Sequence, residues 1–128
     1  MSKRQLHVVE VAYRATLEEQ DDPVVWLCHA LRSAGAELDL LLAGNAVTYG
    51  VRAQQVEPLS FGKRRQKHAP DLVGDLVGLM SKQVACLYVE EDASERGIEA
   101  GELLTGLVPI SRAKLAGLFA RYDQIHRW

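Results

Sequence analysis

The sequence predicts an α/β protein with a largely parallel sheet and helices on both faces. Short apolar segments rich in β-branched residues alternate along the chain with segments of helical periodicity, which is the pattern of parallel α/β folds. The 128 residues suit one domain, and no internal repeat, low-complexity segment or boundary divides them. Hydrophobic residues (48%) and charged residues (25%) lie near globular averages. We therefore expect one folded domain over residues 1–128.

The first part of the chain supplies two predicted strands with a helix between them. Residues 6–11 form a short apolar run with β-branched side chains, which is typical of a buried strand. Asp22 is a good N-cap and precedes a proline, so we expect a helix to begin there and to end at Gly35. Residues 38–43 predict a second strand, and residues 45–53 a short helix.

Residues 54–69 show no clear periodicity, so we expect a long connection between elements. Connections of this length are unusual in compact domains and are often functional. The basic run at residues 63–68 fits either a solvated loop or a contact with an acidic partner or phosphate. Among its functional interpretations, we favour a protein–protein contact.

The remaining residues predict a second series of alternating elements. Pro70 opens a helix, and Gly74 and Gly78 share one face of it, which we interpret as close packing against the sheet. Ser111 is placed to cap the final helix. The other predicted elements are a strand, a short helix, a brief strand and a last edge strand, at residues 84–89, 97–104, 107–110 and 124–128.

Charge and hydropathy exclude several classes of partner. The formal net charge of −2 argues against nucleic acid, because phosphate binding requires a basic excess. The best candidate for a membrane span, residues 40–47, is interrupted by Gly44 and Asn45 and is far shorter than the ~20 residues of a spanning helix. The basic N-terminus is followed by His7 and Glu10 rather than by an uninterrupted apolar region, so it is no signal peptide. We expect a cytoplasmic protein with reduced thiols and no membrane partner.

Polar side chains follow each of the first three predicted strands. In parallel α/β sheets, ligands bind outside the carboxyl ends of the strands, where these loops converge. We therefore expect a crevice at this edge of the sheet. Its candidate binding residues are Glu10, Tyr13, Arg14, Asn45, Tyr49, Glu90, Glu91 and Asp92.

The crevice residues argue against a bound cofactor. The turn at residues 13–22 contains no glycine and many carboxylates, so it would repel the phosphates of a dinucleotide. Neither a phosphate-binding loop nor a nucleophile elbow occurs in the sequence. Carboxylates suit magnesium or calcium, but no spacing matches a metal-binding loop. We predict neither a cofactor nor a metal.

The two cysteines cannot form a disulfide framework or a CxxC motif. Cys28 lies on the apolar face of the first predicted helix, and Cys86 lies inside the third predicted strand. Reactive thiols require exposure and an electropositive setting, so we favour buried core thiols. Cys86 is the thiol candidate for a catalytic role, and Cys28 ranks below it.

Several segments together resemble the DsrE/DsrF-like (TusD-like) family, which includes sulfur-relay subunits. The resemblance runs nearly end to end, and residues 16–22 are similar to a poorly characterised branch of the family. Its motifs are His-Val-Val-Glu at 7–10, Leu-Leu-Ala-Gly-Asn-Ala-Val-Thr-Tyr at 41–49, the segment 90–97 with its Arg-Gly pair, and Tyr-Asp-Gln-Ile at 122–125.

The resemblance implies a fold, an assembly and a departure from the family's chemistry. It implies a three-layer flavodoxin-like (Rossmann-like) sandwich of about five mainly parallel strands, assembled as trimers or hexamers, and it adds Arg96 to the candidate residues. Sulfur-carrying members have a cysteine just past the strand before the Arg-Gly pair. That position falls at Val89, and valine cannot carry a persulfide.

We therefore expect a subunit or binding protein of sulfur metabolism that acts by association with a sulfur-relay protein, and we lean against an enzyme. Two alternatives stay open. The first is a small-ligand or metal-binding enzyme whose crevice carboxylates have raised pKa values and act as acid–base groups. The second is a sulfurtransferase that uses Cys86.

Overall fold

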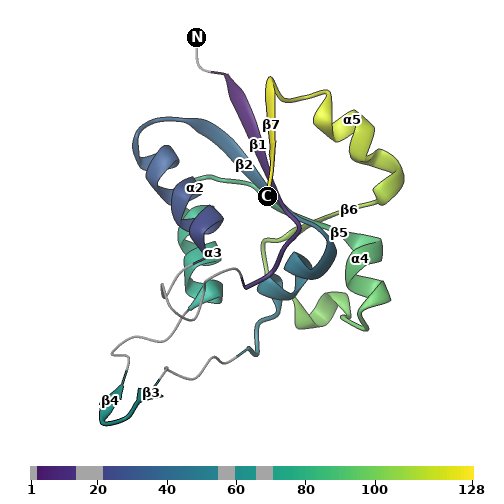
Figure 1. Cartoon of the computed structure of the whole chain (residues 1–128). Helices are drawn as coiled ribbons and strands as arrows, with labels where there is room; N and C mark the ends of the chain where they lie inside the picture. Colours follow the sequence, from purple (N-terminus) through teal and green to yellow (C-terminus); the bar gives the residue numbers. More distant parts are fainter. Residues whose placement is uncertain (1–2, 14–21, 55–59, 66–70) are drawn as a thin grey trace.

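A five-stranded, fully parallel sheet forms the centre of the molecule (Figure 1). The computed structural model describes residues 3–13, 22–54, 60–65 and 71–128. The spatial order of the strands is β6-β5-β2-β1-β7, which leaves β7 at an edge as expected. The strands are β1 (Arg4–Val9), β2 (Glu37–Leu42), β5 (Cys86–Val89), β6 (Val108–Ile110) and β7 (Gln124–Arg127).

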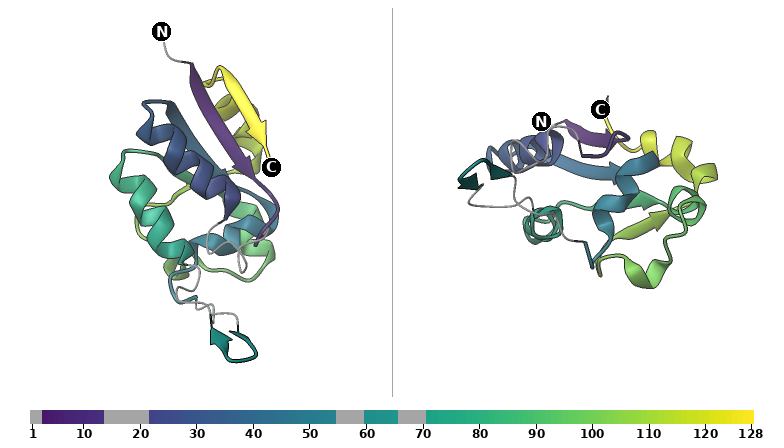
Figure 2. Two further views of the ribbon diagram at one scale, coloured as in Figure 1. Left: turned by 60° about the vertical axis from the view of Figure 1, so that its left-hand side comes forward. Right: turned by 60° about the horizontal axis from the view of Figure 1, so that its bottom comes forward.

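Helices cover both faces of this sheet, which makes three layers (Figure 2). Helices α2 (Pro23–Ser33) and α3 (Leu72–Ser81) lie side by side on one face, and the short helix α5 (Leu115–Phe119) lies on the other. Successive strand residues point to opposite faces of the sheet. Leu40 therefore packs in the core beneath α2 and α3, and Leu41 packs in the core beneath α5. The predicted flavodoxin-like α/β sandwich is confirmed.

The start of α2 follows the sequence prediction. The Asp22 carboxylate accepts hydrogen bonds from the backbone N–H groups of Val24 (2.8 Å) and Val25 (3.1 Å). These bonds satisfy donors that have no partner within the helix. Gly35 follows the helix with φ +98°, a conformation that glycine adopts without a Cβ clash.

The glycines of α3 do not pack against the sheet, and that interpretation is wrong. A Cβ at Gly78 would lie 3.0 Å from Cε1 of His29, which belongs to α2. A Cβ at Gly74 would instead meet the carboxylate of Asp71, which caps α3 by accepting from the Gly74 N–H at 2.9 Å. The absent side chains therefore serve the contact with α2 and the helix cap.

Residues 90–104 differ from the sequence prediction. The acidic residues after β5 begin helix α4 (Glu90–Glu95) at once, without an intervening loop. Gly97, expected to begin a helix, follows the end of α4 with φ +72°, the left-handed conformation typical of a residue past a helix end. Only the 3-10 turn η2 (Ala100–Glu102) remains of the helix expected to reach residue 104.

Two further short elements lie at the carboxyl ends of the strands. The predicted helix at 45–53 is a 3-10 helix, η1 (Gly44–Gly50). The final helix is preceded by a 3-10 turn, η3 (Arg112–Lys114). Ser111 occupies the N-cap position of η3, but its side chain makes no capping hydrogen bond.

The long connection contains a small hairpin. Strands β3 (Ser60–Phe61) and β4 (Arg64–Arg65) pair antiparallel around Gly62, and they stand away from the sheet (Figures 1 and 2). The basic run is described only at residues 63–65, and its remainder and Pro70 lie outside the described residues. In the described part of the chain, we find no helix with the length and hydropathy to cross a membrane.

Candidate functional site

The ends of β1 and β2 and the start of α4 meet at one edge of the sheet, as the sequence predicts. Gly44 lies two residues past the end of β2 and has φ +55°, and a Cβ there would lie 3.3 Å from the carbonyl oxygen of Glu10. Its backbone N–H donates to Oδ2 of Asp92 at 2.7 Å. Glycine is therefore suited to a position where two chain segments pass close together.

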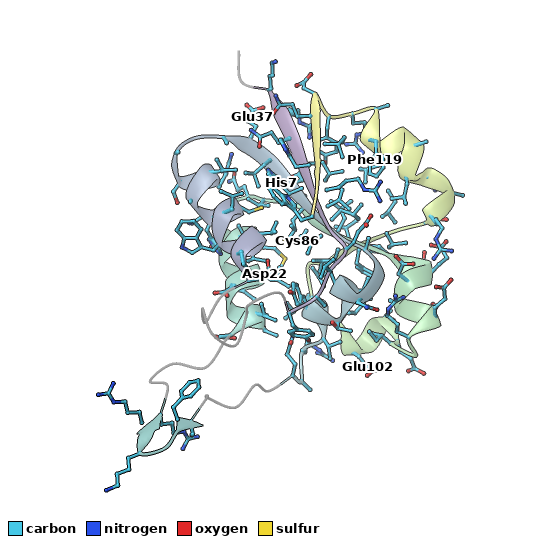
Figure 3. The ribbon with its side chains drawn as sticks, viewed as in Figure 1. His7, Asp22, Glu37, Cys86, Glu102 and Phe119 are labelled. Carbon is cyan, nitrogen blue, oxygen red and sulfur yellow. The ribbon has the colours of Figure 1, made fainter. Side chains whose placement is uncertain are left out.

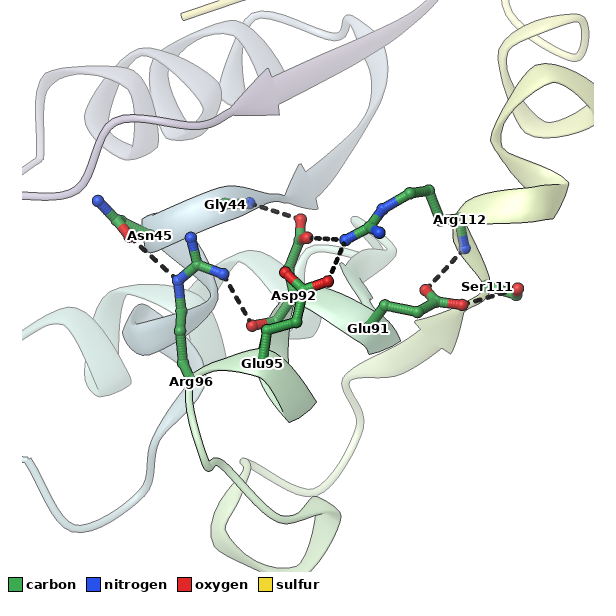
Figure 4. A network of polar contacts seen from close by, with 8 residues as sticks. All are labelled: Gly44, Asn45, Glu91, Asp92, Glu95, Arg96, Ser111 and Arg112. Carbon is green, nitrogen blue, oxygen red and sulfur yellow. Dashed lines mark hydrogen bonds and ion pairs between the residues drawn. The ribbon is translucent and has the colours of Figure 1, made fainter.

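Two arginines contact residues at this edge of the sheet, including the crevice candidates Asn45 and Asp92 (Figure 4). Nη2 of Arg112 lies 2.5 Å from Oδ1 of Asp92 and 3.2 Å from Oε1 of Glu95. Arg96 donates to Oδ1 of Asn45 and to the Asp92 carbonyl oxygen, each at 3.0 Å. Together these contacts tie η1, α4 and η3 to one another.

Glu91 forms a second connection between α4 and η3. Its carboxylate accepts from the Ser111 hydroxyl at 3.0 Å and from the Arg112 backbone N–H at 2.8 Å. Ser111 thus contacts Glu91 rather than capping the helix through its side chain.

The pKa values of two of these carboxylates are lowered, whereas a role in acid–base catalysis predicts raised pKa values. The backbone hydrogen bond from Arg112 is the main cause that lowers the pKa of Glu91. Burial opposes ionisation of Asp92, yet hydrogen bonds from Gly44 and Arg112 lower its pKa overall. Asp92 and, in turn, Glu95 raise the pKa of Arg112. The predicted raised pKa values are therefore wrong for Glu91 and Asp92, whose charges hold elements together.

Glu10 also pairs with an arginine rather than facing an open crevice. Its Oε1 lies 2.5 Å from Nη2 of Arg127, at the end of the edge strand β7. The Glu10 backbone N–H donates to the carbonyl oxygen of Trp128 at 3.0 Å. Arg14, the neighbouring candidate, lies outside the described residues.

Tyr49 is a core residue that supports the start of α2. Its side chain is fully buried, and its hydroxyl donates to Oδ2 of Asp22 at 2.5 Å. The backbone N–H of Tyr13 donates to the same hydroxyl, and the two tyrosine rings meet edge to face with centroids 5.0 Å apart. Tyr49 therefore positions the chain after β1 against the N-cap of α2.

Both thiols are buried in the core, as the sequence predicts, and Figure 3 labels Cys86 among the core side chains. Cys28 is 0% exposed and Cys86 is 1% exposed. Burial, followed by the nearby Cys86 and Asp22, raises the pKa of Cys28 to about 12. Burial, followed by Asp39, raises the pKa of Cys86 to about 12. Val89, where the sequence resemblance would place a carrier cysteine, is also buried at 1% exposure.

Glu90 lies apart from the arginine contacts and lines a hollow of about 420 Å³ beside α4 and η2. No hydrogen bond or ion pair involves the Glu90 side chain among the described residues. Over those same residues, no three histidine, cysteine or acidic side chains gather in a way that could hold a metal. The hollow is lined by Tyr88, Glu90, Ala93, Ser94, Gly97, Ile98, Glu99, Ala100 and Leu103.

Four residues of these contacts, Glu95, Ser111, Arg112 and Arg127, are not among the candidates predicted from the sequence. Arg112 and Ser111 follow the brief strand β6, and Arg127 ends β7, so both sets lie at the carboxyl ends of parallel strands. Extending the same rule to the fourth and fifth strands would have included them. Glu95 carries no such signal, because it reaches Arg112 only through the helical path of α4.

The comparisons with known proteins define a fold class, and they add no function. No family model and no curated protein matches the chain. The solved structure of the ychN protein from E. coli matches this chain with a TM-score of 0.73 and 21% sequence identity, and the match covers both chains completely.

Two proteins of unknown function share this fold. MTH1491 from Methanobacterium thermoautotrophicum matches over the whole of both chains, with a TM-score of 0.65 and 12% identity. BT1422 from Bacteroides thetaiotaomicron has a TM-score of 0.67 and 9% identity, over 97% of this chain and 94% of its own. The chain thus has the same small α/β fold as these proteins.

Proposed function

We propose that this protein is a DsrE-like subunit of sulfur metabolism that acts by association and does not carry a persulfide. The burial of both thiols is the observation that carries the proposal. The sequence motifs and the shared small α/β fold support the family, and Val89 stands where the carrier cysteine is expected. The cytoplasm, where thiols stay reduced, is the proposed location.

Persulfide transfer requires an accessible thiolate. The thiolate attacks the outer sulfur of a donor persulfide, a new S–S bond forms, and the donor leaves as a thiolate. At pH 7, a thiol whose pKa is about 12 is ionised in about one molecule in 10⁵. The buried position of each sulfur also keeps a protein donor away from it. Neither cysteine therefore suits the carrier role.

The β3–β4 hairpin is the proposed contact region. Phe61 is 71% exposed, and the side chains of Lys63 and Arg64 beside it are exposed as well. A large aromatic side chain flanked by basic residues is typical of protein interfaces. We propose that this hairpin contributes to a trimer or hexamer, or to contact with a sulfur-relay protein.

Light scattering on the purified protein tests the association. We expect a trimer or a multiple of it at micromolar concentration, and a smaller species for Phe61→Ser. Val77→Ser is the matched control, because Val77 is another exposed apolar side chain, 48% exposed on α3. A wild-type monomer would contradict the proposed assembly, and equal effects of the two variants would remove the hairpin from it.

Alkylation of the native protein separates this proposal from a sulfurtransferase that uses Cys86. We expect slow modification of both cysteines in the native state and rapid modification of both after denaturation. Peptide mapping of the modified native protein reports each site separately. Rapid native reaction at Cys86 would favour the sulfurtransferase.

A further inference from the structure

We infer that the hollow beside α4 and η2 binds a primary alkylammonium group. The hollow of about 420 Å³ lies at the end of β5, and it falls within the size range of small-ligand sites. This inference stands apart from the proposed function, because a protein that carries no persulfide can still bind an amine. It rests on the polar groups that line the hollow, two of which, the Tyr88 hydroxyl and the Glu90 carboxylate, have no partner among the described residues.

Tyr88 is the first of these groups. Its side chain is only 6% exposed, and it lines the hollow. Within the described part of the chain, its hydroxyl forms no hydrogen bond. Because this hydroxyl is accessible from the hollow and has no protein partner there among the described residues, it is placed to contact a ligand. Burial and the nearby Glu90 raise the pKa of Tyr88, which keeps the hydroxyl neutral.

Glu90 and Glu99 give the hollow a negative charge. Among the described residues, Glu90 has no counter-ion, in contrast to Asp92 in the same helix, which contacts Arg112. No basic side chain is among the residues that line the hollow. The Glu99 carboxylate accepts from the backbone N–H of Glu102. A ligand that neutralises this surface is therefore cationic.

Apolar side chains form the rest of the wall and favour a ligand with a carbon chain. Leu103 and Ala93 are 5% and 3% exposed, and Ile98 lies between them in the sequence. An alkyl chain can lie along these groups while its ammonium group reaches Glu90 and its N–H donates to the Tyr88 hydroxyl. The Ser94 side chain, which also lines the hollow, offers a second hydroxyl.

Two sources could supply such a group, and the experiment includes a probe for each. Free 1,5-diaminopentane represents a small amine, and Nα-acetyl-lysine N-methylamide represents a lysine side chain of a partner protein. The neutral analogue 1,5-pentanediol has a similar chain without the charge. NMR titrations at pH 7 would follow the backbone amides of residues 88–103 in the intact protein.

We expect at least one of the two amines to shift these amides, and the diol to shift them much less. Glu90→Gln should weaken binding about tenfold, and Tyr88→Phe should weaken it by a smaller factor. Glu37→Gln is the matched control, because it removes the same charge from an exposed residue at the opposite end of the sheet. The stronger of the two amines identifies the source.

Three results would overturn the inference. These are no shift with either amine at millimolar concentration, equal binding of the diol, and an equal loss of affinity in Glu37→Gln and Glu90→Gln. Circular dichroism of each variant checks its folding. Because Glu90 is exposed, its substitution keeps the test decisive even if Tyr88→Phe folds poorly.

Discussion

Raising the pH from 8 to 10 should destabilise the wild-type protein more than a Cys86→Ala variant. Burial raises the pKa of Cys86 from 9.0 to about 12 in the folded state. Because the folded pKa is above the unfolded pKa, the thiol's contribution to stability is fully present below pH 9 and is lost between pH 9 and 12. In this window, unfolding releases the thiol proton, so the free energy of unfolding falls as the pH rises.

The magnitude follows from the two pKa values. Between pH 8 and pH 10, one such thiol lowers the free energy of unfolding by about 1.4 kcal/mol. Urea unfolding with a reductant present, at both pH values, measures this change in the wild type and in Cys86→Ala. The variant has its own loss of stability from the removed sulfur, which the difference between the two pH values cancels. Identical pH dependence in the two proteins would refute the burial of Cys86.

Three further outcomes follow from the geometry. Asp22→Ala should lower the free energy of unfolding by about 2–4 kcal/mol, because the helix loses its cap and the Tyr49 hydroxyl loses a buried acceptor. Chemical denaturation measures this loss, and a loss below about 0.5 kcal/mol would contradict the prediction. Gly44→Ala should lower the free energy of unfolding by about 1–2 kcal/mol, because residue 44 has a positive φ and lies close to the Glu10 carbonyl oxygen. An unchanged melting temperature would count against this prediction. Burial, followed by His126, lowers the pKa of His7 to about 4, so its contribution to stability is present above pH 6.5 and is lost as the pH falls toward 4. The free energy of unfolding should therefore decline less steeply over this pH range in His7→Gln than in the wild type. The same decline in both proteins would exclude His7 as the cause.

Local chemistry was sufficient to predict the main elements of the fold. Asp22 and the proline after it define the beginning of α2, because both act on the first helical turn alone. The short apolar runs identify the strands, since a parallel sheet covered on both faces requires continuous apolar segments. The helix α4 was missed, because six residues that begin with three acids show no hydrophobic period.

The site depended on contacts between residues far apart in the sequence. The rule for parallel sheets correctly brought Asn45 and Asp92 to one edge, and Arg96 connects them. It could not show that Tyr49 is buried against Asp22, because that contact joins η1 to the N-cap of α2 through the tertiary fold. Nor could it show that Arg112 neutralises the acidic residues of α4, since this depends on where the chain passes after β6.

The central claim, that this protein carries no persulfide in its native state, can be tested by intact mass spectrometry. The native protein is incubated with a persulfide donor, separated from it and weighed without reduction. We predict an unchanged mass. As a positive control, a DsrE-like protein that has the carrier cysteine should gain one sulfur atom (about 32 Da) under the same conditions. A stable gain of one sulfur by the native wild-type protein, absent in Cys86→Ala, would contradict the account and assign the carrier role to Cys86.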